Sequence, residues 1–312
     1  MDRQLQWDGT SKGSVPGSRI FMWLLRHSGL FPAYCLLIPV SLYYAFFDFK
    51  SMQALRLYWA HCGKKAGTVR LWRHFFRFGL SLLDRYMFLL RTKSPFSFTA
   101  INEQAITAAV NEGKGVILLS AHIGNWEIAG NLLYDRIETP INFTMIDSEK
   151  SEIKEVFGKA IAKRRVNIIP IGLDSMAFVM GVHDALRKGE IVCMHGDRML
   201  GNKGKVMRFL GGSVEFPIGP FSIAAATGAP VIPIFAVKKG LWGRYEMKAY
   251  PPIMVSSDSH MDRNAIVSGA LEGYVKLLEQ VVRENPYEWF NFYDFWGERM
   301  EKPKVESLES KV

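Results

Sequence analysis

Gly115-Val-Ile-Leu-Leu-Ser-Ala-His-Ile-Gly-Asn-Trp-Glu127 is the stretch that decides the fold of this 312-residue chain. The uninterrupted apolar run before Ala121 predicts a strand that is buried on both faces. Gly124-Asn125 favours a turn, and Trp126-Glu127 then opens a helix. A buried strand that leads through a short turn into a helix is the unit from which α/β domains are built.

The same alternation continues along the rest of the chain. Apolar runs predict strands at Val116–Ser120, Ile141–Ile146, Ile168–Ile171, Ile191–Met194 and Val231–Phe235. Other patterns predict helices at Ile101–Asn111, Ile153–Arg165, Met176–Lys188, Phe221–Ala226 and Ala265–Arg283. This order predicts an α/β fold in which helices flank a central, mostly parallel sheet.

Composition divides the chain into four segments. Residues 1–18 are polar and rich in Gly and Ser, and predict a flexible amino-terminal arm. Residues 19–95 are first apolar and then basic and aromatic, whereas residues 96–297 hold the alternating strands and helices. The charged residues 298–312 predict a disordered tail. We therefore expect one α/β domain behind an amino-terminal helical segment that anchors it to a membrane.

The membrane segment is expected in an uncharged run of 20 residues from Ser28 to Phe47. A helix needs about 20 apolar residues to cross the hydrocarbon core of a bilayer. Pro32 and Pro39 interrupt the run, so it could span the membrane, bend inside one leaflet or lie at the interface. A buried core helix is the alternative. No small-residue cleavage site follows the run, which disfavours a removable signal peptide.

Positive charge follows this apolar run. The whole chain has a formal net charge of +9, which suits anionic partners. The basic residues after the run are interspersed with aromatic ones: Lys50, Arg56, Lys64, Lys65, Arg70, Arg73 and Arg77 with Trp59, Trp72, Phe75 and Phe76. Such a mixture suits anionic lipid headgroups, and the positive-inside rule places it in the cytoplasm. No nucleic-acid-binding motif accompanies it, and a solvated face of an amphipathic helix is the plain alternative.

His122 is the candidate catalytic residue. It follows a predicted strand at the carboxyl end, where open α/β sheets bind their ligands. If the chain turns at Gly124, the carboxylate of Glu127 can reach one imidazole nitrogen and fix the tautomer. The other nitrogen could then take a proton from a hydroxyl that attacks a thioester carbonyl. A structural histidine is the alternative at this spacing.

Several segments together resemble the lysophospholipid acyltransferase superfamily, and in particular its lipid A late acyltransferase branch. The first is the H-x-x-x-x-E arrangement of His122 and Glu127 after a strand. The others are Met194–Arg198, Phe209–Pro220 as a glycine and proline loop ahead of a helix, Ala225–Phe235 and the closing Asn285–Phe290. The resemblance covers roughly residues 110–296. It implies an acyltransferase that uses His122 as general base and Glu127 as its partner.

The resemblance also implies a set of substrate-binding residues. These are Asn125, Asp197, Arg198, Gly211, Gly212, Pro217 and Gly219. The guanidinium of Arg198 suits a phosphate or carboxylate, although an ion pair with Asp197 explains it nearly as well. Asn125 could orient His122 or cap the following helix, and a plain turn would also explain Gly211 and Gly212.

The resemblance leaves the substrates open. An acyl-carrier protein or acyl-CoA would be the donor, and a lipid or glycolipid hydroxyl would be the acceptor, at the cytoplasmic face of a bacterial inner membrane. The family often has an H-R-R-like segment after its closing motif, whereas this chain has Phe292-Tyr-Asp-Phe-Trp296. This difference puts lipid A itself in doubt as the acceptor.

Metal and nucleotide chemistry are not expected. Cys35, Cys62 and Cys193 lack the spacing of a zinc site or a disulfide framework. Neither G-x-x-x-x-G-K-[ST] nor G-x-G-x-x-G occurs in the chain. We therefore expect no cofactor and no nucleic-acid partner.

Two other classes of function remain open. In a thioesterase or lipase, water would replace the lipid hydroxyl. The serine version would need a G-x-S-x-G elbow directly after a strand, and none of the predicted strands is followed by one. In a non-catalytic membrane adaptor, His122 would be dispensable.

Overall fold

The computed structural model describes residues 15–90, 95–126, 128, 136–146, 166–171, 175–199, 203–255 and 262–297. The expected disordered tail and the expected helix at Ile153–Arg165 lie outside these ranges. The expected amino-terminal arm lies partly outside them, but its last residues are helical, because α1 begins at Val15.

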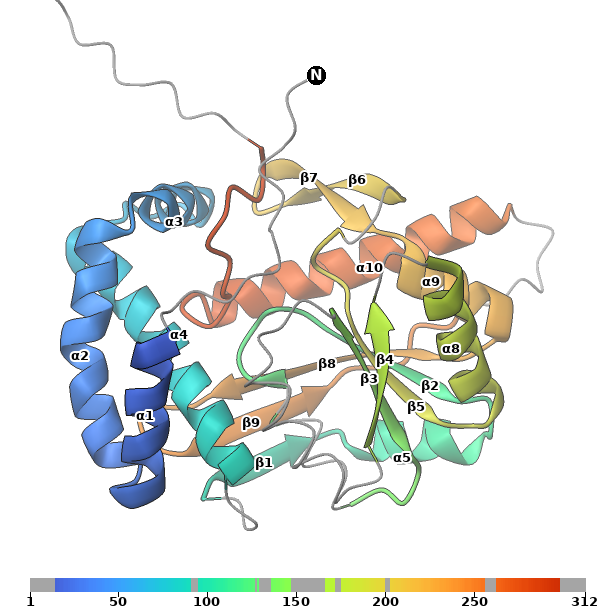
Figure 1. Cartoon of the computed structure of the whole chain (residues 1–312). Helices are drawn as coiled ribbons and strands as arrows, with labels where there is room; N and C mark the ends of the chain where they lie inside the picture. Colours follow the sequence, from blue (N-terminus) through green and yellow to red (C-terminus); the bar gives the residue numbers. More distant parts are fainter. Residues whose placement is uncertain are drawn as a thin grey trace, which may run out of the picture.

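A seven-stranded sheet forms the centre of the molecule, in the order β1-β9-β8-β2-β5-β3-β4 (Figure 1). The strands are β1 (Ser97–Ile101), β2 (Val116–Ser120), β3 (Ile141–Ile146), β4 (Val166–Ile171), β5 (Ile191–His195), β8 (Val231–Lys238) and β9 (Arg244–Ala249). Neighbouring strands run parallel except β8 and β9, which are antiparallel. The predicted α/β fold with a mostly parallel sheet is confirmed.

Helices cover both faces of the sheet (Figure 1). Residues of β2 alternate between two core clusters, because successive side chains of a strand point to opposite faces. Ile117 and Leu119 pack in the cluster that includes α8 (Ser175–Arg187), α9 (Gly219–Thr227) and α10 (Arg263–Glu284). Val116 and Leu118 pack with α5 (Gln104–Asn111) on the other face. A strand buried on both faces is what its unbroken apolar sequence predicts.

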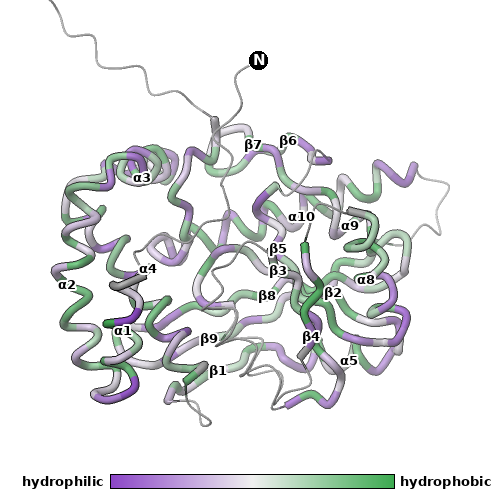
Figure 2. The backbone as a smooth tube through the Cα atoms, in the orientation of Figure 1, coloured by the Kyte–Doolittle hydropathy of each residue, from purple (hydrophilic) through white to green (hydrophobic). Residues whose placement is uncertain are grey.

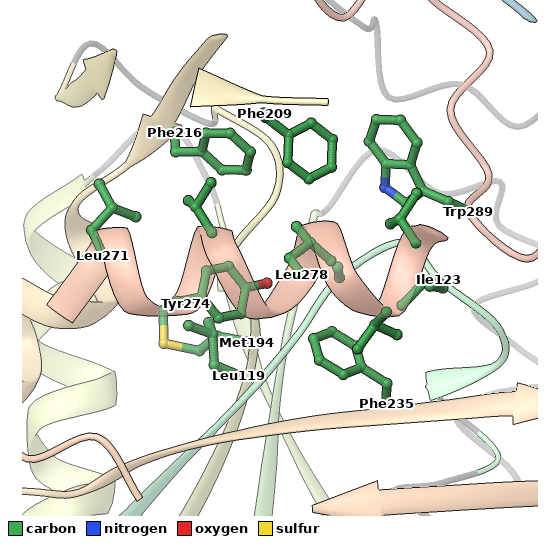
Figure 3. Packing of buried hydrophobic residues seen from close by; sticks show 14 of the residues in the cluster. Leu119, Ile123, Met194, Phe209, Phe216, Phe235, Leu271, Tyr274, Leu278 and Trp289 are labelled. Carbon is green, nitrogen blue, oxygen red and sulfur yellow. The ribbon is translucent and has the colours of Figure 1, made fainter. Parts of the chain in front are cut away.

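A two-stranded hairpin of β6 (Gly204–Phe209) and β7 (Gly212–Pro217) lies outside the main sheet. Leu210 and Gly211 join the strands with φ angles of 50° and 83°, the sign that a type I′ hairpin turn requires. The sequence interpretation took this segment for a glycine and proline loop, and the structure corrects it to strand. Figure 3 shows Phe209 and Phe216 of the hairpin on one side of α10, with Leu119 and Met194 of the sheet on the other.

Four helices precede the sheet: α1 (Val15–His27), α2 (Leu30–Phe47), α3 (Phe49–His61) and α4 (Thr68–Leu90). The uncharged run forms α2, which continues through Pro39 and is long and apolar enough to cross a membrane. Figure 2 shows hydrophobic colour along most of it. Leu25 of α1, Leu37 of α2 and Leu83 of α4 share a core cluster with Tyr245 of β9. Therefore α1, α2 and α4 pack directly against the sheet at β9.

A buried ion pair fastens these helices to the sheet. Lys238 on β8 donates to Asp84 on α4 at 2.5 Å, and the two side chains are 2% and 0% exposed. Tyr34 of α2 and Tyr245 of β9 also donate hydrogen bonds to Asp84. Burial of a charge is tolerated when it is paired and hydrogen-bonded, and both conditions hold here.

Candidate active site

His122 and Asp197 meet because their strands are neighbours in register. β2 and β5 pair in parallel, and Ser120 lies opposite His195. His122 follows Ser120 by two residues and Asp197 follows His195 by two, so both leave the sheet at the same carboxyl edge. This edge is where open α/β sheets place their ligands.

Asp197 holds both the backbone and the side chain of His122. The Nδ1 atom of His122 lies 2.8 Å from Oδ1 of Asp197, and the backbone N–H of His122 donates to Oδ2 at 2.9 Å. Trp289 donates from Nε1 to the same Oδ2 at 3.3 Å. The Asp197 side chain is 1% exposed, whereas that of His122 is 25% exposed. The dyad therefore presents the histidine, and not the carboxylate, to the surroundings.

The charge states of the dyad follow from its neighbours. Burial alone would raise the pKa of Asp197, but His122 and Arg198 bring that pKa well below its ordinary value. Burial and the positive charge of Arg198 lower the pKa of His122, although Asp197 opposes them. At neutral pH the pair is therefore an ionised carboxylate beside a neutral imidazole. Since a carboxylate only accepts, Nδ1 carries the proton, and Nε2 is the unprotonated nitrogen of the neutral ring.

The loop after His122 is held against the rest of the domain at Gly124. This glycine has a φ of +65°, and a Cβ there would lie 1.8 Å from the Ala236 carbonyl oxygen. Its backbone N–H donates to the Glu288 carbonyl at 2.7 Å, and Ser81 of α4 donates to its carbonyl at 3.2 Å. Only glycine fits this close approach to β8, so the position of the loop that follows His122 depends on it.

Asn125 has a structural role in the described residues. Its Oδ1 accepts from the backbone N–H of Ile128 at 3.4 Å, which caps the turn that follows. Its Nδ2 donates to the Ser81 carbonyl of α4 at 2.9 Å, and the residue is buried. The sequence offered two roles for this residue, to orient His122 or to cap the following helix, and the contact that the capping role requires is present.

A second histidine lies against the first. The rings of His195 and His122 stack with centroids 4.4 Å apart, and Trp126 meets His195 edge-on at 4.6 Å. Nε2 of His195 is buried and has no hydrogen-bond partner in the described structure. Burial and the neighbouring His122 hold the pKa of His195 well below its ordinary value. His195 is therefore neutral and supports the His122 ring from one side.

Arg198 is turned toward the closing segment of the domain. Its Nη2 donates to the Phe290 carbonyl at 2.9 Å, and its guanidinium lies over the Tyr293 ring at 5.4 Å. Phe290 in turn donates its backbone N–H to the His122 carbonyl at 2.8 Å. Arg198 thus links the segment after α10 to the histidine loop, and it places a positive charge near the dyad.

Of the predicted glycine and proline residues, three lie on the hairpin and one begins the helix that follows it. Gly211 forms the turn, and Pro217 ends β7 in register with Gly204. A Cβ on Gly212 would lie 2.3 Å from the Trp296 ring, so the packing of that tryptophan requires glycine there. Gly219 begins α9. Phe209 of the hairpin contacts Trp289 at 5.4 Å between ring centroids, which connects the hairpin to the dyad through one residue.

Glu127, the predicted partner of His122, lies outside the described residues. The contact that the sequence assigned to it, at one imidazole nitrogen, is made in the described structure by Asp197. The signal for Asp197 was present, because Met194–Arg198 follows an apolar strand as His122 does. The two side chains meet because β2 and β5 are neighbours in the sheet. The order of strands along the chain does not show which strands are neighbours. Among the described residues, no group of three His, Cys, Asp or Glu side chains forms a metal site.

Comparison with known proteins gives a family and several relatives. Residues 86–297 match the profile of a family described as bacterial lipid A biosynthesis acyltransferase. The chain is 24% identical over 210 residues to a phosphatidylinositol mannoside acyltransferase of Mycobacterium tuberculosis, covering 66% of this chain and 62% of that protein. It is 25% identical over 197 residues to the protein of the same name from Mycolicibacterium smegmatis, covering 62% of this chain and 60% of that protein. The chain thus matches about three fifths of the length of these curated relatives.

Proposed function

Because the chain belongs to the bacterial lipid A biosynthesis acyltransferase family, we propose that it transfers a fatty acyl chain from a thioester donor to a membrane lipid. The acceptor group is a hydroxyl of a lipid or glycolipid. The observation that carries the proposal is the dyad of His122 and Asp197, which lie 2.8 Å apart at the carboxyl edge of a mostly parallel sheet. A neutral, partly exposed imidazole fixed by a buried carboxylate is the arrangement that general-base catalysis needs.

In the proposed reaction, Nε2 of His122 takes the proton of the acceptor hydroxyl. The hydroxyl oxygen attacks the thioester carbonyl carbon and forms a tetrahedral intermediate. The intermediate collapses, the carbon–sulfur bond breaks, and the thiolate leaves with the proton that His122 holds. Asp197 keeps the proton on Nδ1 and stabilises the imidazolium between these two transfers.

Other residues have supporting roles in this proposal. Arg198 lies near the dyad, so its charge suits an anionic group of the donor or of the lipid. Glu127 remains the second carboxylate of the H-x-x-x-x-E motif, with a predicted role in stabilising the imidazolium. The assignment of Gly211, Gly212, Pro217 and Gly219 to substrate binding also remains a prediction, and the hairpin that carries most of them is the element to test.

The donor is an acyl-carrier protein or acyl-CoA, both of which are anionic and match the +9 charge of the chain. The named activity of the relatives, acylation of a phosphatidylinositol mannoside, favours a glycolipid acceptor. The proposed location is the inner membrane of a bacterium, with the catalytic domain in the cytoplasm. One apolar helix and the membrane-lipid family support membrane association.

A purified-enzyme assay tests the proposal. The full chain is incubated with a radiolabelled acyl-carrier protein or acyl-CoA, with and without a membrane lipid extract. The expected result is label in a lipid that has gained one acyl chain, and only when extract is present. Label that appears as free fatty acid at the same rate with and without extract would identify a hydrolase instead.

The pH dependence of catalysis should reflect the lowered pKa of His122. The base works only when it is neutral, and its unperturbed pKa is about 6.5. Because burial and Arg198 lower that pKa, activity is expected to persist below pH 6.5. The acid limb of kcat/KM should therefore have its midpoint below about 6.5. A midpoint above that value would contradict the neutral, desolvated histidine.

Replacing Asp197 by Asn should lower kcat by roughly 10- to 100-fold, since a hydrogen bond to a charged group contributes about 1.5–3 kcal/mol. The amide also lacks the negative charge that raises the pKa of His122, so the acid limb should move to lower pH. Both changes are read from one pH–rate series on the purified variant. A variant with unchanged kcat and an unmoved acid limb would remove Asp197 from the mechanism.

A further inference from the structure

The outer face of α2 is apolar along its whole length. Its exposed residues recur every three or four positions, which places them in one stripe on the helix. They are Phe31, Cys35, Ile38, Pro39, Leu42, Tyr43, Phe46 and Phe47. Within Leu30–Phe47, all of which the structure describes, none of the exposed residues is charged. A stripe of this length and composition, defined here as the α2 stripe, is not expected to face water.

The opposite face of α2 lies on α4 from one end to the other. Near the start of α2, Tyr34 donates to Asp84. In the middle, Trp72 of α4 donates to Ser41 at 3.0 Å. Near the end, the rings of Tyr44 and Phe75 stack with centroids 6.3 Å apart. Gly79 of α4 allows close approach, since a Cβ there would lie 2.4 Å from Leu37. The two helices therefore lie side by side (Figure 1).

The other side of α4 contacts the α/β domain that carries the dyad. His74 donates from Nε2 to the Trp289 carbonyl at 3.0 Å, and Arg77 donates to the Lys238 carbonyl at 2.8 Å. Ser81 donates to the Gly124 carbonyl in the histidine loop. A bilayer-spanning α2 would carry α4, with its arginines and these contacts, into the hydrocarbon core. The cost of placing such charges there makes that arrangement untenable.

We propose that α2 lies in the plane of the membrane, with the α2 stripe in the interfacial region of one anionic leaflet, and does not cross the bilayer. Trp23 and Trp242 are 58% and 55% exposed, and tryptophan is enriched at the interface of membranes. The Trp242 ring stacks on Phe31 at 6.0 Å, so the turn between β8 and β9 extends the same apolar surface.

Charge around the α2 stripe matches an anionic leaflet. Arg26 precedes α2, Lys50 and Arg56 follow it, and all three are exposed. Basic residues beside an apolar and aromatic face are typical of helices that rest on anionic lipid. If a second copy of the chain covered the α2 stripe, the burial of apolar surface would not require these basic residues. The geometry also joins the membrane surface to catalysis, because α4 packs under α2 and holds Gly124.

Spin labels on the α2 stripe test the proposal. Cys35 is a native exposed thiol on the stripe, and replacing Cys62 by Ser and Cys193 by Ala leaves it as the single label site. Three further chains carry Phe31→Cys, Ile38→Cys or Phe46→Cys. In each of them Cys35 is replaced by Ser in addition to the replacements at Cys62 and Cys193. Each full-length protein is bound to vesicles of phosphatidylglycerol and phosphatidylcholine. The depth of each nitroxide is measured from its accessibility to oxygen and to a water-soluble nickel chelate, with Lys276→Cys on α10 as the control exposed to water.

An in-plane helix predicts the same shallow depth at all four positions and free access of the nickel chelate at the α10 control. A spanning helix predicts graded depths, because Phe31 and Ile38 are seven residues apart and would differ by about 10 Å. Graded depths would overturn the proposal. Labels shielded from both reagents, with spin–spin broadening between chains, would overturn it in favour of a second copy. The measurement needs no turnover, so loss of the proposed acyl transfer would leave its result interpretable.

Discussion

Replacing His122 by Ala is expected to lower turnover by roughly 10²–10⁴-fold, the range for loss of a general base. The acceptor hydroxyl would then have no group positioned to take its proton. Asp197 does not substitute, because its side chain is 1% exposed and its pKa is held low. Turnover is measured with purified protein in lipid vesicles under saturating donor and acceptor. KM for the donor should change little, since the imidazole acts on the acceptor.

A matched control separates this effect from loss of structure. His183 lies on α8 and takes no part in the contacts described around the dyad, so His183→Ala should retain wild-type turnover. Both variants should give the same circular dichroism spectrum as the wild type. A folded His122→Ala protein with near-normal turnover would refute the general-base mechanism.

Replacing Asp84 by Ala should destabilise the protein by about 3–5 kcal/mol, as expected when one partner of a buried ion pair is removed. The Lys238 side chain, which is 2% exposed, would keep its hydrogen bond to the Tyr34 hydroxyl but would lose its carboxylate partner. Tyr34 and Tyr245 would also lose their acceptor. The free energy of unfolding is measured by chemical denaturation in detergent.

The double variant Asp84→Leu with Lys238→Met is the control for the charge. It removes both ions and keeps an apolar volume, so it should recover most of the lost stability. If Asp84→Ala alone unfolds at the wild-type denaturant concentration, the ion pair does not fasten α4 to the sheet. If the double variant is as unstable as the single one, the loss would come from packing and not from an unpaired charge.

Periodicity predicted the centre of the fold well and its edges poorly. β2, β5 and β8 contain unbroken apolar runs, so the sequence predicts a buried strand in each. Apolar and polar residues alternate in β1 and β9, and no strand was predicted in either segment. The helix predicted from Ile101 begins only at Gln104. The β6–β7 hairpin was missed because its turn contains Leu210, a residue type that rarely adopts a positive φ and is not typical of hairpin turns.

The site shows the same limit. His122 was found from its motif, and Asp197 was expected near the substrate. Its contact with Nδ1 depends on β2 and β5 being neighbours, although about 70 residues separate them in the chain. The tie between Asn125 and Ser81 depends in the same way on α4 packing beside the loop. Sequence reports which side chains follow strands, whereas strand order decides which of them meet.

The most direct test of the acyltransferase mechanism is lipid mass spectrometry of bacteria that express the wild-type chain or His122→Ala at equal membrane levels. The proposed mechanism predicts a lipid that gains the mass of one acyl chain with the wild type and not with the variant. That mass would also identify the acceptor and the acyl length. The same acylated lipid in both strains, at equal abundance, would contradict the assignment of His122 as the catalytic base.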